Sequence, residues 1–279
     1  MAFNYNHCMK ANQKTVLITG TSSGMGRATV VYLAAQGYVV YAGSRTPHKL
    51  FDIQSENIRP IKLDITQMSS IEEALLYIGN IDVLINNAGY GLVSTVEDVT
   101  ESEMFAQFNV NLFGLLRMCK AVIPKMRHQK HGVIINISSF LGKIGLPLLT
   151  FYNASKYAVE GVTDSLRYEL KDFNIRVHSI MPGFFDTNFA KDNLVMNAET
   201  FKKDSVYTSL VSTLAPTIVA QINNGNDTAE VAALILQLIE EENSLARQTA
   251  GDKAKKFIPM KKELSDEDFE RRVRAYYKL

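Results

Sequence analysis

Short apolar runs alternate with longer segments of helical periodicity along most of the chain. Short, nearly continuous apolar runs predict strands of a parallel sheet, because both faces of such a sheet are covered. The predicted strands cover 15–19, 38–42, 58–63, 82–86, 132–137, 175–180 and 246–250. Between them, apolar residues three or four positions apart predict helices over 24–36, 71–78, a long stretch ending near 126, 152–171 and 227–242.

This alternation predicts one α/β domain, a doubly wound parallel sheet of about seven strands with helices on both faces. The domain is expected to span 1–279, with an N-terminal extension at 1–13, a substrate-loop region at about 184–226 and a C-terminal helical tail at about 252–279. The substrate loop is compatible with helices but not with a strand. In the tail, Ser265–Asp268 resembles a helix capping box, with Phe269, Val273 and Tyr276 on one face of the helix that follows.

Composition describes an ordinary globular protein, since 46% of the 279 residues are hydrophobic. Thirty basic residues against 29 acidic ones give a net charge near +1, which predicts no nucleic-acid partner. Cys8 and Cys119 form no disulfide framework and the N-terminus has no basic or apolar leader, so a cytoplasmic location is expected. No apolar stretch approaches the roughly 20 residues that cross a bilayer, and no metal site is expected.

The most informative chemical pattern is Tyr152 followed four residues later by Lys156. Positions i and i+4 lie on one face of a helix, so the ammonium is expected near the phenol. An ordinary phenol has a pKa of about 10, and a nearby cation lowers that pKa toward the working range of a general acid or base. The pair predicts redox chemistry on carbonyls and alcohols. An amphipathic helix with a surface lysine is the alternative.

A glycine-rich segment, Thr19–Gly26, lies where the first predicted strand turns into the first helix. Glycines let the backbone approach a pyrophosphate closely, and a helix N-terminus supplies unpaired N–H groups and a positive dipole end. The spacing Gly-x-x-x-Gly-x-Gly therefore predicts a dinucleotide site, with a plain glycine-rich turn as the alternative. The expected cofactor contacts are Gly20, Thr21, Ser22, Ser23, Gly24, Met25 and Gly26.

The end of the second strand bears on which dinucleotide is bound. An acidic residue there would hold the ribose hydroxyls of NAD, but the sequence has Ser44 and Arg45. A guanidinium can take a 2′-phosphate in a bidentate way, so NADP(H) is favoured over NAD(H), although Arg45 is also compatible with an ordinary surface arginine. Asp64 is expected to bind the adenine amino group or to cap a helix, and Ile65 to lie against the adenine ring.

Together these segments resemble the short-chain dehydrogenase/reductase family over roughly residues 15 to 190. Further motifs in the order typical of that family are Asn86-Asn-Ala-Gly89, Asn111 in Asn109–Gly114, Ser139 in Asn136–Ser139, and Pro182-Gly183 through Thr187. The resemblance implies a Rossmann fold and a homodimer or homotetramer, with helices near 103–127 and 152–171 as the interface. It also implies cofactor contacts from Asn86, Asn87, Ala88, Gly89, Tyr152, Lys156, Pro182, Gly183 and Thr187.

The resemblance further implies a catalytic tetrad of Asn111, Ser139, Tyr152 and Lys156. Tyr152 would exchange a proton with the substrate oxygen, and Ser139 would hydrogen-bond the same oxygen. Lys156 would lower the pKa of Tyr152 and bind the nicotinamide ribose, while Asn111 would hold a water in a proton relay. Ser138 competes with Ser139, but the spacing to Tyr152 matches the family at Ser139.

The expected function is NADP(H)-dependent interconversion of a carbonyl, ketone or aldehyde, and an alcohol. A lipophilic substrate is expected because the positions predicted to face it are apolar: Tyr90, Leu92, Phe140, Leu141, Ile144, Phe184, Phe185 and Phe189. Many NADP-preferring members carry a basic residue where this chain has Ser23, so Arg45 would act alone. The alternatives are a non-catalytic NADP(H)-binding regulator or scaffold, and an isomerase or epimerase that conserves its cofactor.

Overall fold

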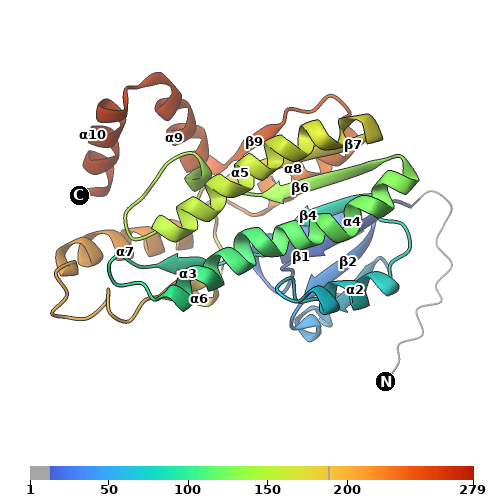
Figure 1. The fold of residues 1–279 in the computed structure, drawn as a ribbon, viewed down its shortest axis with the longest axis horizontal. Helices are drawn as coiled ribbons and strands as arrows, with labels where there is room; N and C mark the ends of the chain where they lie inside the picture. The colour runs from blue at the N-terminus through green and yellow to red at the C-terminus, as the bar shows by residue number, and fades with distance from the viewer. Residues whose placement is uncertain (1–12, 188) are drawn as a thin grey trace.

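Seven parallel strands form the centre of the computed structural model, which describes residues 13–187 and 189–279 (Figure 1). Their spatial order is β3-β2-β1-β4-β6-β7-β9, which confirms the predicted doubly wound sheet. The strands are β1 (Thr15–Thr19), β2 (Val39–Ser44), β3 (Ile58–Lys62), β4 (Val83–Asn86), β6 (Gly132–Ile137), β7 (Ile175–Pro182) and β9 (Arg247–Ala250). Every residue of β1, β2, β4 and β6 is buried, as the apolar runs require.

Helices cover both faces of the sheet. One face carries α1 (Gly24–Ala35) and α8 (Ala229–Glu240), and their buried residues share a core cluster with β1, β2, β4 and β6. The other face carries α2 (Met68–Leu76), α4 (Leu115–Gln129) and α5 (Thr150–Leu170), and in Figure 1 the long α4 and α5 cross in front of the strands. Each helix buries one apolar stripe, so the periodicity in the sequence was sufficient to locate these five.

The chain leaves β1 outward to β2 and β3 and then returns to β4, which pairs with the opposite side of β1. In open α/β sheets this reversal of direction opens a crevice at the carboxyl ends of the two central strands, where ligands bind. The glycine-rich segment follows β1 and Asn87-Ala88-Gly89 follows β4, so the topology brings both motifs to the same crevice. The expected N-terminal extension lies outside the described residues except for Gln13.

The substrate-loop region contains a strand that the sequence analysis excluded. After β7 it forms α6 (Phe189–Asp192), β8 (Leu194–Met196) and α7 (Thr208–Asn223), and β8 pairs in parallel with β5 (Gly91–Val93). The prediction of no strand there is wrong. Val195 and Met196 are about half exposed, so β8 carries no buried apolar run and owes its form to pairing across the tertiary structure.

The C-terminal tail folds as two helices, α9 (Gly251–Glu263) and α10 (Asp266–Tyr277), which stand at one end of the molecule in Figure 1. Ser265 caps α10 as predicted, because its hydroxyl accepts a hydrogen bond from the Asp268 amide at 3.1 Å. Phe269 and Val273 are buried as predicted, but Tyr277 is the fully buried tyrosine and Tyr276 is only partly buried. None of the helices within residues 13–187 and 189–279 combines the length and apolar character needed to cross a bilayer.

Candidate active site

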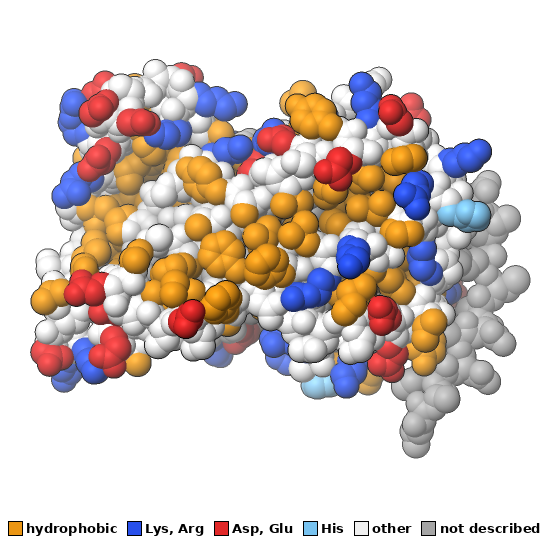
Figure 2. Space-filling model, in the orientation of Figure 1, with side chains coloured by type: hydrophobic (Ala, Val, Ile, Leu, Met, Phe, Trp, Pro, Cys, Tyr) orange, Lys and Arg blue, Asp and Glu red, His pale blue; other side chains and the backbone are white. Residues whose placement is uncertain are grey.

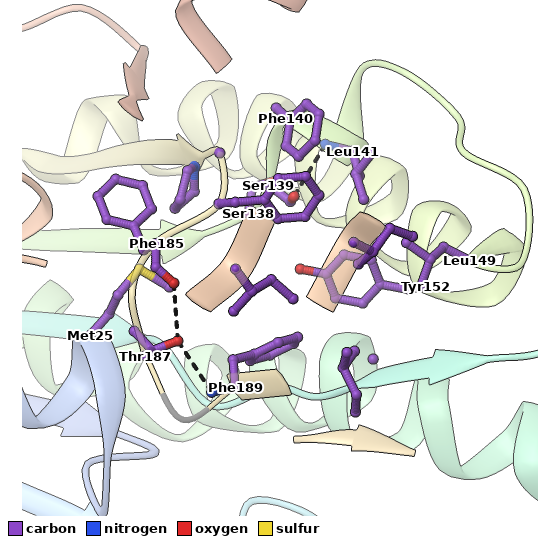
Figure 3. A pocket seen from close by; sticks show the side chains of 17 residues that line it. Met25, Ser138, Ser139, Phe140, Leu141, Leu149, Tyr152, Phe185, Thr187 and Phe189 are labelled. Carbon is purple, nitrogen blue, oxygen red and sulfur yellow. Dashed lines mark hydrogen bonds between the residues drawn. The ribbon is translucent and has the colours of Figure 1, made fainter. Parts of the chain in front are cut away.

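The phenol of Tyr152 and the hydroxyl of Ser139 lie next to each other at one end of the sheet. Tyr152 is on the first turn of α5, and Ser139 precedes the single 3-10 turn Phe140–Gly142 after β6. The Ser139 oxygen accepts a hydrogen bond from the Leu141 amide at 3.1 Å, which fixes its direction. Figure 3 shows the Tyr152 phenol oxygen directed toward the middle of a pocket that both residues line.

The structure distinguishes the two neighbouring serines. The Ser138 hydroxyl donates a 3.5 Å hydrogen bond to the backbone carbonyl of Lys156 in α5. The Ser139 hydroxyl is the one that interacts with the Tyr152 phenol, and this contact counteracts part of the upward pKa shift of that phenol. The geometry therefore favours Ser139 over Ser138 as the partner of Tyr152.

Lys156 approaches Tyr152 but does not act on its pKa as the sequence analysis expected. Its ammonium is 5.7 Å from the centre of the Tyr152 ring and donates a 2.8 Å hydrogen bond to the Ile137 carbonyl. Burial raises the pKa of Tyr152 to about 12, the opposite direction from the expected one, because the charged phenolate is disfavoured away from water. Burial likewise lowers the pKa of Lys156 to about 8, and the negative charge of Glu160 limits this fall.

Asn111 lies in a π-helical turn, Asn109–Gly114, which joins α3 (Glu101–Phe108) to α4 and interrupts the single long helix predicted there. Its side chain is fully engaged: the amide nitrogen donates to the Tyr90 carbonyl and the Ser155 hydroxyl, and the amide oxygen accepts from the Tyr90 amide. One extra residue per turn frees backbone groups locally, and such turns are frequent at functional sites. The Asn111 side chain is thus held against α5 and next to Gly89.

Gln107 was not singled out from the sequence, yet it holds the same segment. Its side chain is fully buried, accepts from the Leu92 amide at 2.7 Å and donates to the Tyr90 carbonyl at 2.8 Å. Together with Asn111 it fastens the start of β5 to the helix behind it. Its position one helical turn before Asn111 was the available signal.

The glycine-rich segment and the residues after β4 form a close-packed cradle. A methyl group on Gly20, which has φ of +71°, would lie 2.6 Å from the Ala88 backbone, so only glycine fits. The Asn87 side chain donates to the Thr19 and Gly20 carbonyls at 3.0 Å each. The N-terminus of α1 opens beside this cradle, and its N-cap residue Ser23 makes no side-chain capping bond within the described residues.

The other residues expected to contact the cofactor here differ in burial and in hydrogen bonding. The Thr21 hydroxyl is buried and donates to the Gly43 carbonyl at 3.1 Å. Ser22 is half-buried at the same turn, and Met25 reaches into the pocket beside Tyr152. On the far side, Thr187 lies 3.4 Å from where a methyl on Gly24 would be. The loop after β7 therefore sits against the glycine-rich segment.

At the end of β2, the positions expected to select the cofactor face different surroundings. Ser44 is buried and its hydroxyl accepts from the Thr46 amide at 3.0 Å. Arg45 is exposed, and its guanidinium makes no hydrogen bond or ion pair with residues 13–187 or 189–279. Arg45 therefore presents its guanidinium to solvent at the carboxyl end of β2.

Asp64 and Ile65 follow β3. The Asp64 carboxylate accepts from the amide and hydroxyl of Thr66 at 2.9 and 2.7 Å, a local turn before α2. The N-cap of α2 is Gln67, so the hypothesis that Asp64 caps that helix is wrong. Ile65 is 7% exposed and packs against Gly114 of the π-helical turn.

The pocket that Tyr152 and Ser139 line is partly open to solvent. Five of the residues expected to face substrate line it: Phe140, Leu141, Phe184, Phe185 and Phe189. Pro182, Gly183 and Thr187 line it as well, whereas Tyr90, Leu92 and Ile144 do not. Leu92 and Ile144 are instead core residues, each 1% exposed.

The sequence analysis missed other walls of this pocket, contributed by Leu149, Leu194, Ile218 and Ile222. Ile218 and Ile222 are four residues apart on α7, with Leu214 four residues earlier, so a helical apolar stripe was visible in the sequence. The rings of Phe140 and Phe184 pack edge to face with their centres 5.3 Å apart. Phe257 of the tail lies behind Phe140, with 6.4 Å between the two ring centres. The tail thus backs the pocket wall.

Comparisons with known proteins fit this arrangement. A family model described as short chain dehydrogenase matches residues 14–197. A 3-ketodihydrosphingosine reductase from Bacteroides thetaiotaomicron is 37% identical over 272 residues, covering 95% of this chain and 98% of that protein. A 3-oxoacyl-[acyl-carrier-protein] reductase from Thermotoga maritima is 36% identical over 189 residues, 64% of this chain and 77% of that protein.

Solved structures agree in fold. A short-chain dehydrogenase from Streptomyces avermitilis superposes with a TM-score of 0.80 at 30% identity, covering 96% of this chain and 97% of that one. A short chain dehydrogenase from Burkholderia cenocepacia, solved in complex with NADP, has a TM-score of 0.73 at 25% identity and covers 95% and 97%.

Proposed function

The chain belongs to the short-chain dehydrogenase family, and from this premise we propose that it is an NADP(H)-dependent oxidoreductase that interconverts a lipophilic ketone or aldehyde and its alcohol. The observation that carries the proposal is the meeting of Tyr152 and Ser139 in a pocket with mostly apolar walls, next to the glycine cradle. A reacting oxygen placed between the two hydroxyls would have its carbon chain against phenylalanine, leucine and isoleucine side chains.

The cradle supports dinucleotide binding because Gly20 and Gly26 leave no room for a side chain, and the N-terminus of α1 opens beside them. Gly20, Gly24 and Gly26 with the N-terminus of α1 would hold the pyrophosphate, and Ala88 and Gly89 would lie beside it. When bound, the nicotinamide cofactor supplies or accepts a hydride. The remaining tasks fall to the protein, which must bind, orient and exchange a proton.

Tyr152 would be the proton donor. Because burial raises its pKa to about 12, the phenol is protonated at neutral pH and suited to give a proton to a carbonyl oxygen. Ser139, fixed by the Leu141 amide, would hydrogen-bond the same oxygen and stabilise the negative charge that develops on it. This assignment favours the reductive direction.

Lys156 and Asn111 would restore the proton. The Lys156 ammonium, 5.7 Å from the centre of the Tyr152 ring, would stabilise a transient phenolate, and it would also bind a ribose hydroxyl of the cofactor. Since the Asn111 side chain is occupied by Tyr90 and Ser155, its backbone carbonyl in the π-helical turn is the group we assign to the water of the relay.

Preference for NADP(H) is supported by Arg45, which is exposed and directed to solvent beside the crevice. A 2′-phosphate can take two charge-assisted hydrogen bonds from one guanidinium. The Burkholderia cenocepacia relative was solved with NADP. Asp64, Ile65 and Ser44 would line the adenosine end, with Ser44 acting through its lack of charge.

The proposed substrate is a long-chain ketone held by side chains of the Ser139 turn, α5, α6 and α7, with the tail behind the pocket wall. The apolar pocket supports this, and so does the 37% identity to a 3-ketodihydrosphingosine reductase over almost the full length of both chains. The first compound to test is 3-ketodihydrosphingosine, which the name of that relative gives. The second is a 3-oxoacyl thioester, suggested by the Thermotoga maritima relative.

The test is NADPH oxidation with these two compounds and a short methyl ketone, with Tyr152→Phe beside wild type. Loss of the proton donor is expected to lower kcat by about 10²- to 10⁴-fold while NADPH affinity stays within a few-fold. Tyr77→Phe is the matched control, since Tyr77 is 66% exposed and does not line the pocket. Full activity of Tyr152→Phe would remove the assigned role, and tight NADPH binding without turnover would support the regulator hypothesis.

We also propose a homodimer or homotetramer that uses α4 and α5. Figure 2 shows apolar side chains gathered over the face formed by these helices. Phe113, Tyr157 and Tyr168 are 44%, 46% and 82% exposed. Light scattering after gel filtration, with Phe113→Asp as the disrupting variant, checks the assignment; a monomeric wild type would contradict it.

A further inference from the structure

Within residues 13–187 and 189–279, two charged residues expose less than a tenth of their surface: Lys156 is 5% exposed and Glu160 is 2% exposed. They are one helical turn apart on α5, so they share a face. Lysine and glutamate are almost never buried unless paired. The proposed function uses Lys156 and leaves Glu160 without a role.

Glu160 joins three segments, two of which bear site residues. Its Oε2 atom is 2.6 Å from the Arg247 Nε of β9 and 3.5 Å from the Lys143 Nζ, which follows the turn of Ser139. Gly142, in that turn, packs so closely on α5 that a methyl there would lie 3.2 Å from the Glu160 Cγ and 2.9 Å from the Lys156 carbonyl. The carboxylate therefore sits where α5, the Ser139 turn and the sheet edge meet.

Packing alone does not explain a carboxylate at this place. The other oxygen, Oε1, is buried and has no hydrogen-bond partner within the described residues, which is costly for a charged group. Arg247 does not depend on Glu160 alone, since its Nη2 atom is also 2.5 Å from Asp164, a half-exposed residue. An apolar side chain would fill the site without this desolvation cost.

We propose that Glu160 is a positioning residue whose buried carboxylate keeps Lys156 charged and holds the Ser139 turn against α5. The inference rests on the proposed function, in which the ammonium of Lys156 serves proton return and ribose binding. The charged or titratable groups that face this region are Lys143, Arg247, Asp164 and Tyr152. Of these four residues only Tyr152 lines the pocket beside Ser139, and its phenol is neutral below its pKa of about 12.

The direction of the effect follows from the charges. Burial lowers the pKa of Lys156 to about 8 and Glu160 opposes this, so removal of the carboxylate lowers the pKa of Lys156 further. Activity that needs the ammonium falls as pH rises through that pKa. The alkaline limb of kcat/KM is therefore expected to move to lower pH in Glu160→Gln.

The experiment compares Glu160→Gln with Asp164→Asn in kcat/KM from pH 6 to 10 and in NADPH affinity over the same range. Glutamine keeps the shape of the side chain and a hydrogen-bonding group for Arg247. We expect Glu160→Gln to move the alkaline limb down by about one pH unit, with weaker NADPH binding at pH 8 than at pH 6. Asp164→Asn, which also removes a partner of Arg247, is expected to keep the wild-type limb.

A third variant separates the effect of charge from that of packing. Lys143→Met removes a cation near Lys156, so the alkaline limb of kcat/KM is expected to move to higher pH or to keep its position. A move of that limb to lower pH would overturn the inference. An unchanged limb and unchanged NADPH affinity in a folded Glu160→Gln would also overturn it. If wild type turns over no substrate, the proposed function fails, and the pH dependence of NADPH binding still decides the role of Glu160.

Discussion

Substitution of Gly26 by alanine tests whether the cradle at the start of α1 binds the cofactor. Gly26 has ordinary helical geometry, so alanine is tolerated by the backbone itself. Its methyl group, however, would lie 2.4 Å from the Gly20 carbonyl oxygen and 2.5 Å from the Asn87 side-chain nitrogen. Restoring ordinary contact needs a displacement of about 1 Å. The Gly20 oxygen belongs to the backbone, and the Asn87 amide nitrogen, although it ends a side chain, is held by two hydrogen bonds.

The displacement acts on hydrogen bonds that shape the cradle. Asn87 donates to the Thr19 and Gly20 carbonyls at 3.0 Å each, and moving it away sacrifices both. At about 1 kcal/mol for each bond the loss is about 2 kcal/mol. If the cofactor requires the undistorted cradle, NADPH dissociation constants rise about 30-fold, since 1.4 kcal/mol corresponds to tenfold.

The assay is a fluorescence titration with NADPH, with urea unfolding measured in parallel. Gly79→Ala is the matched control, because an added methyl at Gly79 meets nothing within 4 Å and Gly79 lies outside both the cradle and the proposed interface. That variant is expected to keep NADPH affinity and to change the unfolding free energy by no more than about 1 kcal/mol. A folded Gly26→Ala protein that binds NADPH within twofold of wild type would refute the argument.

Three further substitutions test separate parts of the structure. Arg45→Gln is expected to weaken NADPH binding about tenfold or more and leave NADH unchanged, since charge-assisted bonds to a phosphate contribute about 1.5–3 kcal/mol; equal effects on both cofactors in titration would contradict this. Ile218→Phe narrows the pocket from α7, so steady-state kinetics should show a higher KM for long-chain ketones but not for short ones, and a uniform change would argue against this wall. Tyr277→Phe removes a buried hydroxyl that has no partner within the described residues, so urea unfolding should show a gain of about 1–2 kcal/mol, and a loss would mean the hydroxyl is satisfied.

Local patterns along the chain were enough to predict the sheet and the residues that carry the chemistry. Apolar runs such as Thr15–Thr19 predict buried strands because parallel strands are covered on both faces, and these strands are present. The i, i+4 spacing of Tyr152 and Lys156 placed both on one helix, which the structure also has. Such patterns are local: the period of burial along a few residues reflects the geometry of the element those residues form.

Tertiary structure alone decided what surrounds these groups. β8 forms because Leu194–Met196 meets β5, more than 90 residues earlier in the chain, and no local period indicates that pairing. The pocket combines side chains from the Ser139 turn, α5, α6 and α7, so membership depends on how the segments pack. The pKa of Tyr152 rises where the neighbouring lysine predicted a fall, because burial outweighs a cation that donates elsewhere. Burial is a property of the whole packed chain, and for that reason the walls and electrostatics of the site were beyond what spacing in the sequence could fix.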